Sequence, residues 1–418
     1  MPCKGYTTGM KNIRSQNQST ETQSLHFRIN NAETHPVATP IYQNSAFTAD
    51  SPYFYTRKSN PNSVELEGAL AILERSKHVV TTTTGMSAIM LVLQQLKPGD
   101  HLVVNQYIYG CSYKLFQRYA QQMNLTLTIL DLSEGVGRES IPDDVSMVLF
   151  ETPTNPFLKT IPIAEVAEIM AKKNPKALLV VDNTWATALF QNPLECGAHV
   201  SLASATKYIS GHSDVMGGFI AVNDDQLADD LLQSRFYSGA ILDPNSAWLL
   251  RRSLHTFPIR MREHLRITQT LATFLKTRDE VGKIYLPETS KNQLRSYGGI
   301  LFFEFSKDDS ELNSSEDGYT QFRDALTLFD SGTGMACVSS MVAQPWSGSH
   351  ASLCDVEKIE MGINTGLVRL CFGLEDADDL IRDLENAFSA MSLFKPRETK
   401  KEIRKRVVTR RARRWTKR

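Results

Sequence analysis

Short apolar runs alternate with helical patterns between about residue 77 and residue 223. Stretches with helical spacing, such as SAIMLVLQQL and SYKLFQRYAQQM, separate several of these runs. Strands that are apolar throughout and are joined by helices are typical of a parallel sheet covered on both faces. The pattern therefore predicts an α/β fold with a doubly wound domain of about seven strands. The expected strands are 78–84, 101–106, 125–132, 145–152, 177–184, 200–206 and 217–223.

The pattern changes after about residue 245. Long helical stretches come first, and the expected strands 298–305 and 366–373 follow, with a helix beginning DADDL after them. This order predicts a smaller C-terminal α+β domain, with a polar surface loop at 306–318. The expected division is an N-terminal arm (1–50), a large domain (51–245), a C-terminal small domain (246–395) and a tail (396–418).

Composition narrows the class of protein. The 418 residues are 41% hydrophobic and 22% charged, which is ordinary for a globular protein. No apolar run approaches the roughly 20 residues that span a bilayer, and the first twenty residues lack the apolar stretch of a secretory signal, so we expect no membrane association. Six cysteines without paired spacing indicate reduced thiols in the cytoplasm, and nine histidines without a ligand motif indicate no metal site.

The formal net charge of zero conceals an asymmetry. Residues 395–418 hold 13 Lys or Arg and 2 Asp or Glu, so the rest of the chain holds 33 basic and 44 acidic side chains. Clustered cations gain free energy from counterion release on nucleic acid. Two interpretations stay open: a solvated tail without a binding role, and a catalytically lapsed protein that binds nucleic acid or an anionic surface through this tail.

Two residues at the ends of neighbouring expected strands suggest chemistry. Lys207 follows strand 200–206, and Asp182 lies at the end of the apolar part of strand 177–184. Open α/β sheets bind ligands at the carboxyl ends of their strands, so we expect both side chains to face one pocket. A partly desolvated lysine has a lowered pKa and serves as nucleophile and base. A carboxylate facing a ring nitrogen keeps that nitrogen protonated.

A phosphate site is expected beside this pair. The segment TTTTGMSAI passes from a strand into a helix, so the N–H groups of Gly85 and Met86 point toward an anion. The hydroxyls of Ser204 and Thr206 lie next to Lys207 and suit phosphate oxygens. A lysine that forms a Schiff base, an acid for a pyridine nitrogen and a phosphate site together describe a site for pyridoxal 5'-phosphate.

Several ordered motifs extend this interpretation. Over about residues 36–392 the chain resembles the pyridoxal-phosphate enzymes of cysteine and methionine metabolism, the transsulfuration family of cystathionine synthases and lyases. The resemblance implies the fold type I architecture of pyridoxal-phosphate-dependent transferases, with a mostly parallel seven-stranded sheet and a smaller C-terminal α+β domain. The motifs are FYTRKSNPNSVELEGALAILE, TTGMSAI, YGCSY, ETPTNP, VVDNTWAT, SATKYISGHSDVMGG and LVRLCFGLEDADDLIRDLE.

The resemblance implies roles for individual residues. Lys207 resembles the catalytic lysine that holds the cofactor and then moves protons, and Tyr109 resembles the tyrosine that stacks on the cofactor ring. Asp182 resembles the partner of the pyridine nitrogen, and Asn155 resembles a polar residue near the ring. Arg369 resembles the arginine that grips the substrate α-carboxylate through a bidentate fork.

Other matched residues imply phosphate binding and an assembly. The residues that resemble phosphate ligands are Gly85, Met86, Ser204 and Thr206. Tyr55 and Arg57 resemble residues that the family donates to the phosphate site of a neighbouring subunit. The resemblance therefore implies a homo-oligomer, at least a dimer and commonly a homotetramer built as a dimer of dimers. For Tyr55, Tyr109 and Asn155, ordinary packing or turn formation stays the alternative.

One segment departs from the family pattern. The family carries Ser-Leu-Gly-Gly where residues 326–350 of this chain carry Gly334 at the serine position and Ala336 and Cys337 at the two glycine positions. Thr333 precedes them and is neither the glutamate of γ-enzymes nor the tyrosine of a β-lyase. Because this segment lies over the substrate side chain in the family, we expect Thr333 to be a substrate contact that supplies a substitute hydroxyl.

The implied function is γ-replacement or elimination on a homoserine ester or a sulfur-containing amino acid, with a thiol as the candidate co-substrate. A C–S lyase of the cystathionine β-lyase, cystathionine γ-lyase or methionine γ-lyase type stays the alternative. Trp185 is similar to β-lyase-like members, Cys111 stands where methionine γ-lyases have cysteine, and Lys114 stands where γ-synthases and γ-lyases often have arginine. The residues therefore leave the choice between β- and γ-chemistry open.

Overall fold

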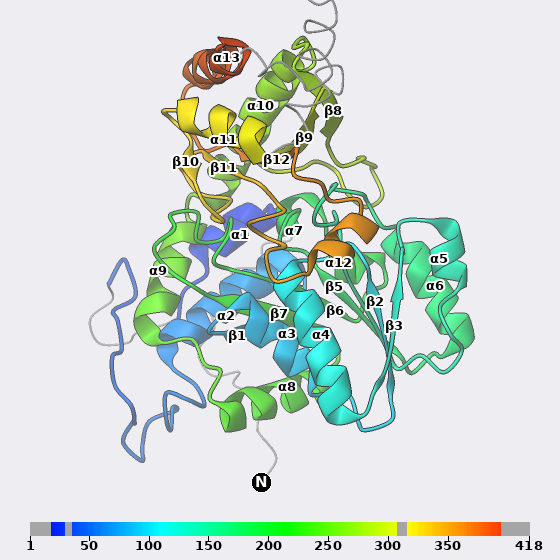
Figure 1. Ribbon diagram of the computed structural model, residues 1–418. Helices are drawn as coiled ribbons and strands as arrows, with labels where there is room; N and C mark the ends of the chain where they lie inside the picture. The colour runs from blue at the N-terminus through cyan, green and yellow to red at the C-terminus, as the bar shows by residue number, and fades with distance from the viewer. Residues whose placement is uncertain (1–17, 30–35, 307–315, 394–418) are drawn as a thin grey trace, which may run out of the picture.

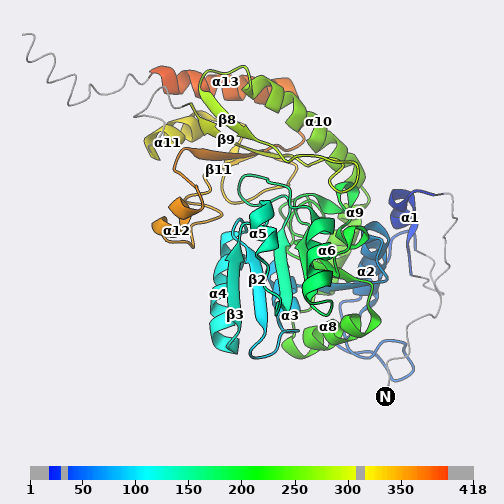
Figure 2. The ribbon, with the colours of Figure 1, turned by 90° about the vertical axis from the view of Figure 1, so that its right-hand side faces the viewer.

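A seven-stranded sheet and a five-stranded sheet form the framework of the molecule (Figure 1). The computed structural model describes residues 18–29, 36–306 and 316–393. Helices flank both faces of the large sheet, with α4 (Gly110–Met123) on one side and α6 (Ile163–Lys173) on the other (Figure 2). The expected α/β class is confirmed.

All seven strands predicted for the large sheet are present. The strand order is β1-β7-β6-β5-β4-β2-β3, and β7 runs antiparallel to both neighbours while the other pairs are parallel. In β2, Leu102 and Val104 join one apolar cluster and Val103 joins another, so the strand is buried on both faces. The strands are β1 (His78–Thr82), β2 (His101–Asn105), β3 (Thr126–Leu130), β4 (Met147–Glu151), β5 (Leu178–Asp182), β6 (Val200–Ala203) and β7 (Gly218–Val222).

Capping residues define where the helices around this sheet begin and end. The Asn60 side chain accepts from the N–H of Asn62 at the start of α2, and Asp224 accepts from Leu227 at the start of α8. Gly239 ends α8 in the left-handed conformation that glycine adopts without strain. Besides α4 and α6, the helices of this region are α2 (Pro61–Glu74), α3 (Gly85–Leu93), α5 (Gly135–Glu139), α7 (Thr187–Phe190), the 3-10 turn Pro193–Cys196 and α8 (Asp225–Ser238).

The second sheet has more strands than the apolar pattern predicts. The two predicted strands correspond to β9 (Ile300–Phe305) and β12 (Leu367–Cys371). The pattern missed β8 (Val281–Tyr285), β10 (Asp330–Ser331) and β11 (Met341–Ala343): Gly282 and Lys283 interrupt the apolar run of β8, and the other two strands are very short. The order is β10-β11-β12-β9-β8.

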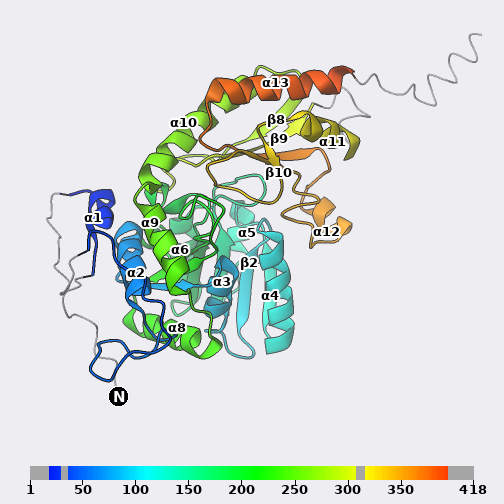
Figure 3. The same ribbon diagram turned by 90° about the vertical axis from the view of Figure 1, so that its left-hand side faces the viewer.

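Within the described ranges, four helices accompany the second sheet, and α9 (Pro244–Leu254), which precedes them in the chain, packs on α2 beside the large sheet. Two of them, α10 and α13, cover the face that points away from the large sheet (Figure 2). A third, α12, reaches down toward α4 (Figure 3), where Lys114 Nζ lies 2.7 Å from Glu357 Oε1. The helices of the second sheet are α10 (Phe257–Leu275), α11 (Glu316–Ala325), α12 (Asp355–Glu360) and α13 (Ala377–Leu393).

Two expectations for irregular segments need correction. The N-terminal arm contains a short helix, α1 (Thr20–His26), whose N-cap Ser19 accepts from the N–H of Thr22. The ring of Phe27 lies where a Cβ at Gly68 would be, at 2.1 Å, so the arm packs closely on α2. Residues 316–318 belong to α11 and not to the polar loop, because the helix begins at Glu316.

Some predictions fall outside the described residues. The basic tail, 396–418, lies there, as do 1–17 of the arm and 307–315 of the polar loop. Among the residues that are described, no helix is long and apolar enough to cross a membrane. In the same part of the chain, no group of three His, Cys, Asp or Glu side chains is arranged to hold a metal ion.

Candidate active site

The carboxyl ends of β5 and β6 are joined by side-chain hydrogen bonds. Asp182 Oδ1 accepts from the N–H of Thr184 at 3.0 Å and from its hydroxyl at 2.6 Å. The N–H of Ser204 donates in turn to the Thr184 hydroxyl, at 2.9 Å. Burial raises the pKa of Asp182, and the two hydrogen bonds from Thr184 oppose that effect. The second carboxylate oxygen of Asp182 has no protein donor among the described residues, so it is free for a ligand.

Lys207 lies in the turn that follows β6. Its N–H donates to Ser204 O at 3.2 Å, and its carbonyl accepts from the N–H of Gly211 at 2.8 Å. Burial lowers the pKa of Lys207, and the positive charge of Arg369 lowers it further. Within the described chain, no carboxylate forms an ion pair with its ammonium group. The side chain is therefore suited to act as a nucleophile and a base.

The start of α3 packs directly on the end of β6. A Cβ at Gly85 would lie 2.8 Å from Ser204 Cβ, so only glycine permits this approach. The Thr84 side chain caps α3 by accepting from the N–H of Ser87 at 3.0 Å. In the described residues, the N–H groups of Gly85 and Met86 have no protein acceptor. Together with the helix dipole, these donors form a cradle for an anion.

The hydroxyl of Thr206 is engaged within its own turn. It lies 3.2 Å from Gly217 O, to which it donates, and 3.0 Å from Gly217 N, from which it accepts. It keeps one acceptor lone pair but has no further proton to donate. The structure thus brings Gly85, Met86 and Ser204 together, whereas Thr206 meets a phosphate only after exchanging its bond to Gly217 O.

Tyr109 and Asn155 occupy turns beyond β2 and β4. Tyr109 is the N-cap of α4 and its N–H donates to Glu151 Oε2 at 3.1 Å. Burial raises the pKa of Tyr109 to about 12, and a hydrogen bond with Cys111 adds to the shift. Asn155 precedes the second of two cis X-Pro bonds and is 3% exposed. Its Oδ1 is buried and has no partner in the described structure, which leaves an acceptor for a ligand.

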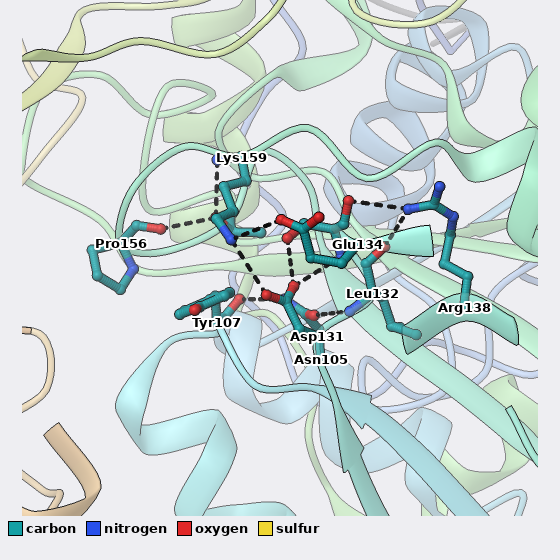
Figure 4. Close-up of polar contacts among 10 residues, drawn as sticks. Asn105, Tyr107, Asp131, Leu132, Glu134, Arg138, Pro156 and Lys159 are labelled. Atoms are coloured by element: carbon teal, nitrogen blue, oxygen red, sulfur yellow. Dashed lines mark hydrogen bonds and ion pairs between the residues drawn. The ribbon is translucent and has the colours of Figure 1, made fainter. Parts of the chain in front are cut away.

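An ion-pair cluster lies among the loops that contain these turns (Figure 4). Lys159 Nζ lies 3.3 Å from Asp131 Oδ2, 3.5 Å from Glu134 Oε1 and 4.6 Å from the ring centroid of Tyr107. Asn105 Nδ2 donates to Tyr107 O at 3.0 Å. These contacts connect the loops that follow β2, β3 and β4, and two of the three loops carry Tyr109 and Asn155.

Arg369 brings the second sheet to the same site. The side chain is 2% exposed, and Nη2 donates to the carbonyls of Thr333 at 3.1 Å and Gly334 at 2.9 Å. Its Nε is buried without a partner in the described residues. Thr333 itself is exposed, and its carbonyl oxygen contacts Arg369. A Cβ at Gly334 would lie 2.4 Å from Met341 Sδ, so Met341 fills the space beside this glycine.

The structure does not bring Tyr55 and Arg57 to Lys207 within one chain. Arg57 Nη1 donates to Phe236 O at 2.8 Å, and its guanidinium lies 4.2 Å from the Phe236 ring centroid. Tyr55 forms an isolated antiparallel bridge with Ala46. In the described part of the chain, neither residue hydrogen-bonds to the Lys207 turn or to α3.

Sequence reasoning missed two buried residues of this region. Glu151 ends β4 and is the register partner of Asp182, so its place at a strand end was a signal available in FETPTNP. His350 is fully buried, with Nε2 3.2 Å from Ile108 O and Nδ1 3.0 Å from the Ser349 hydroxyl. Burial lowers the pKa of His350 to about 4, so the ring is neutral at physiological pH. The available signal was the alignment of residues 326–350 with the family pattern, in which His350 falls at the family's histidine.

The arrangement fits pyridoxal 5'-phosphate. A lysine without a counter-ion, a strand-end acid with a free oxygen, an anion cradle at Gly85 and the unpaired Asn155 Oδ1 are the donors and acceptors that this cofactor needs. The fold and the site together define a pyridoxal-phosphate-dependent enzyme of fold type I.

Comparison with known proteins identifies the family. A model described as Cys/Met metabolism PLP-dependent enzyme matches residues 21–389. A cystathionine beta-lyase of Coxiella burnetii is 35% identical over 85% of this chain and 93% of its own. An L-methionine gamma-lyase of Fusobacterium nucleatum is 34% identical over 84% of this chain and 92% of its own.

A solved cystathionine gamma synthase from Xanthomonas oryzae pv. oryzae superposes with a TM-score of 0.85 and 33% identity, covering 90% of this chain and 99% of that one. This chain belongs to the Cys/Met metabolism family of pyridoxal-phosphate-dependent enzymes. It is an enzyme of sulfur amino acid metabolism with lyase or transferase chemistry.

Proposed function

We propose that the enzyme catalyses γ-replacement or γ-elimination on a homoserine ester or a sulfur-containing amino acid, with a thiol as co-substrate when replacement occurs. The observation that carries the proposal is the convergence of Lys207 and Arg369, whose charge lowers the pKa of that lysine. An amine and a carboxylate-binding guanidinium in one pocket are what an α-amino acid substrate requires.

The cofactor is assigned to the carboxyl edge of the large sheet. Bound pyridoxal phosphate supplies an electron sink for negative charge that develops at the substrate α-carbon. Asp182 would keep the pyridine nitrogen protonated, and that positive charge opposes the effect of burial on the carboxylate. The phosphate ligands in this proposal are Gly85, Met86, Ser204 and Thr206. Thr206 takes part by donating to a phosphate oxygen in place of Gly217 O.

The residues proposed to face the substrate and the cofactor ring have separate roles in proton transfer and binding. Lys207 would hold the cofactor, and its amine would take the α-proton of a bound amino acid and return protons later in the reaction. The lowered pKa keeps more of that amine unprotonated at neutral pH. Tyr109, with a pKa of about 12, stays a neutral phenol that packs on the cofactor ring and donates a hydrogen bond. Arg369 binds the α-carboxylate, and Asn155 contributes a polar contact at the ring.

A C–S lyase is the second candidate. The segment over Arg369 presents Gly334 and the thioether of Met341 in place of a serine hydroxyl. An apolar lining of this kind suits a thioether substrate such as cystathionine or methionine better than an ester. The curated relatives are themselves named for cystathionine and methionine lyase activities. In this candidate the exposed hydroxyl of Thr333 is the polar group nearest the substrate side chain.

We also propose that the enzyme is a homo-oligomer, built as a dimer of dimers, in which Tyr55 and Arg57 complete a neighbour's phosphate site. Support comes from Arg57, which contacts Phe236 and not Lys207, and from Phe54, which is 69% exposed beside it. A cytoplasmic location is supported by the exposed free thiols of Cys111 and Cys354. Size-exclusion chromatography with light scattering tests the assembly.

One substrate panel tests the function. Purified enzyme is incubated with cystathionine, methionine, cysteine and O-acyl-homoserines, with and without a thiol, and products are identified by mass spectrometry. We expect α-keto acid or thioether products from γ-substituted substrates. Cleavage of cystathionine, methionine or cysteine without an added thiol, with no product from O-acyl-homoserines, would instead establish the second candidate. Absence of the cofactor absorption band from the purified enzyme would refute both.

A further inference from the structure

Glu151 is a buried carboxylate that the roles above leave unused. It is 3% exposed, it ends β4, and it pairs in register with Asp182 at the end of β5. Both side chains therefore lie at the same edge of the large sheet. Burial raises the pKa of Glu151 well above its ordinary value, and the neighbouring charge of Asp182 raises it further. Burying a carboxylate beside a second acid costs free energy, so we expect Glu151 to have a specific role at this position.

The two oxygens of Glu151 have different partners. Oε1 accepts from the indole N–H of Trp185, which is 4% exposed and follows β5. Oε2 accepts from the backbone N–H of Tyr109 at 3.1 Å. Both hydrogen bonds are buried or partly buried, and each joins β4 to a different neighbouring segment. Both carboxyl oxygens of Glu151 therefore act as acceptors, and the two donors that face them cannot turn away.

The bond to Tyr109 controls a turn and not only a side chain. Tyr109 is the N-cap of α4, and its own side chain makes no capping bond. The backbone there has φ −47° and ψ 129°, so the direction in which the ring leaves the turn depends on what fixes this peptide. Gly110 follows in contact distance of Ser349 and His350, so the other side of the turn is already packed against the second domain.

We propose that Glu151 is a positioning residue whose two carboxylate oxygens, bound to Trp185 and to the N–H of Tyr109, set the Tyr109 ring over the cofactor. The inference rests on the proposed role of Tyr109 and deepens it. Trp185 is the fixed point of this device, because its ring also packs on Phe302, with centroids 6.1 Å apart. Because Glu151 is held by Trp185 and binds the N–H of Tyr109, it restrains the backbone of the turn at residue 109.

A glutamine at this position gives a sharp test. Glu151→Gln keeps the volume but has one acceptor oxygen, so either Trp185 or Tyr109 then faces an amide NH₂. We expect Glu151→Gln to bind pyridoxal phosphate about tenfold more weakly or worse, because a buried donor is left facing a donor. Affinity is measured by titrating the apoenzyme and following tryptophan fluorescence, and the position of the bound cofactor band is recorded by absorption.

The double variant Glu151→Gln/Trp185→Phe separates positioning from charge. Phenylalanine removes the competing donor, so the single amide oxygen is free to accept from Tyr109. We expect this variant to recover cofactor affinity and band position to within about threefold of Trp185→Phe alone. For this pair, affinity is followed by absorption, since one tryptophan has been removed. Trp185→Phe by itself loses the bond at Oε1 but retains the bond from Tyr109, so it should bind the cofactor more weakly than wild type and more tightly than Glu151→Gln.

Glu304→Gln is the matched control, because Glu304 accepts from a neutral donor, the Tyr285 hydroxyl at 2.6 Å, on the second sheet. It should leave cofactor affinity unchanged. The proposal is overturned if Glu151→Gln binds the cofactor like wild type, or if the double variant stays as weak as Glu151→Gln. It is also overturned if Trp185→Phe alone is equally impaired. Failure of the wild type to bind the cofactor would instead refute the proposed function.

Discussion

The strand ends of the large sheet and the segment 329–341 of the second domain both border Lys207, but they hold the site in different ways. At the strand ends, side chains accept or donate within the site: Asp182 accepts from Thr184, and the Thr184 hydroxyl accepts from the backbone N–H of Ser204. In the segment, the backbone carbonyls of Thr333 and Gly334 accept from Arg369. The Thr333 side chain takes no part in this contact.

This difference explains where the family pattern is kept and where it is lost. Replacing a side chain at the strand ends removes a hydrogen bond from the site itself. Replacing a side chain in the segment 329–341 leaves the carbonyls of Thr333 and Gly334 in place, so the Arg369 contact survives. Met341 has filled the space that a side chain at residue 334 would use. Substrate selectivity can therefore change here without dismantling the cofactor site.

The largest effect on turnover is expected from removing the Lys207 amine at the strand ends. Lys207→Ala should lower kcat by about a thousandfold or more, since both the nucleophile and the proton-transfer group are lost. Stopped-flow or product assays measure turnover, and loss of the absorption band of covalently held cofactor provides an independent reading. Lys172→Ala, at an exposed position of α6, is the control. Full turnover in Lys207→Ala would refute the assignment.

A buried acid behind the phosphate cradle gives a pH-dependent effect. Burial raises the pKa of Glu74 to about 7, and the Ser201 hydroxyl donates to it at 3.0 Å. The folded protein holds the proton of Glu74 more tightly than the unfolded chain does. The contribution of protonated Glu74 to the free energy of unfolding is therefore fully present below pH 4.5 and is lost as pH rises to about 7. Glu74→Gln should therefore unfold with a free energy about 3 kcal/mol higher at pH 8 and nearly equal at pH 4.5.

Urea unfolding at the two pH values measures this difference. Gln keeps the acceptor for Ser201, so packing is preserved and the charge is the variable. Equal stabilities of wild type and Glu74→Gln at pH 8 would show that the carboxylate does not carry the expected penalty there.

Arg369→Lys tests the second region at its centre. Lysine keeps the charge but loses the planar fork, so we expect KM for the amino acid to rise about thirtyfold, equivalent to ~2 kcal/mol, with the cofactor band unchanged. Arg252→Lys, at an exposed position of α9, controls for the exchange itself. An altered cofactor band with unchanged KM would place Arg369 at the cofactor and contradict the proposed role.

The smallest effect is expected at the glycine beside Met341. Gly334→Ser pushes the flexible end of Met341 aside, so the free energy of unfolding should fall by about 1 kcal/mol. Gly334→Ser/Met341→Ala removes the clash and places a hydroxyl near Arg369. We expect this double variant to shift the ratio of kcat/KM toward homoserine esters and away from methionine. An unchanged ratio would show that the segment does not determine selectivity.

Much of the large sheet and its site was predictable because the information is local. Val, Ile and Leu runs of strand length identified all seven strands, and the carboxyl ends of those strands identified Asp182, Ser204 and Lys207. The second sheet was only partly predictable, since Gly282 and Lys283 interrupt the apolar run of β8 and β10 has two residues. Such strands form because neighbours with longer apolar runs offer unpaired backbone groups, which no local pattern reveals.

By itself, the sequence determined the fold class and the cofactor and predicted Lys207 as the residue that holds it, because each depends on residue type at a strand end. Only the tertiary structure decided which residues meet across the chain. It placed Glu151 between Trp185 and Tyr109, seated His350 against Ile108, and put Met341 in the space beside Gly334. Such contacts depend on how strands and loops pack in three dimensions, and the contact of His350 with Ile108 depends on the packing of the second domain against the large one.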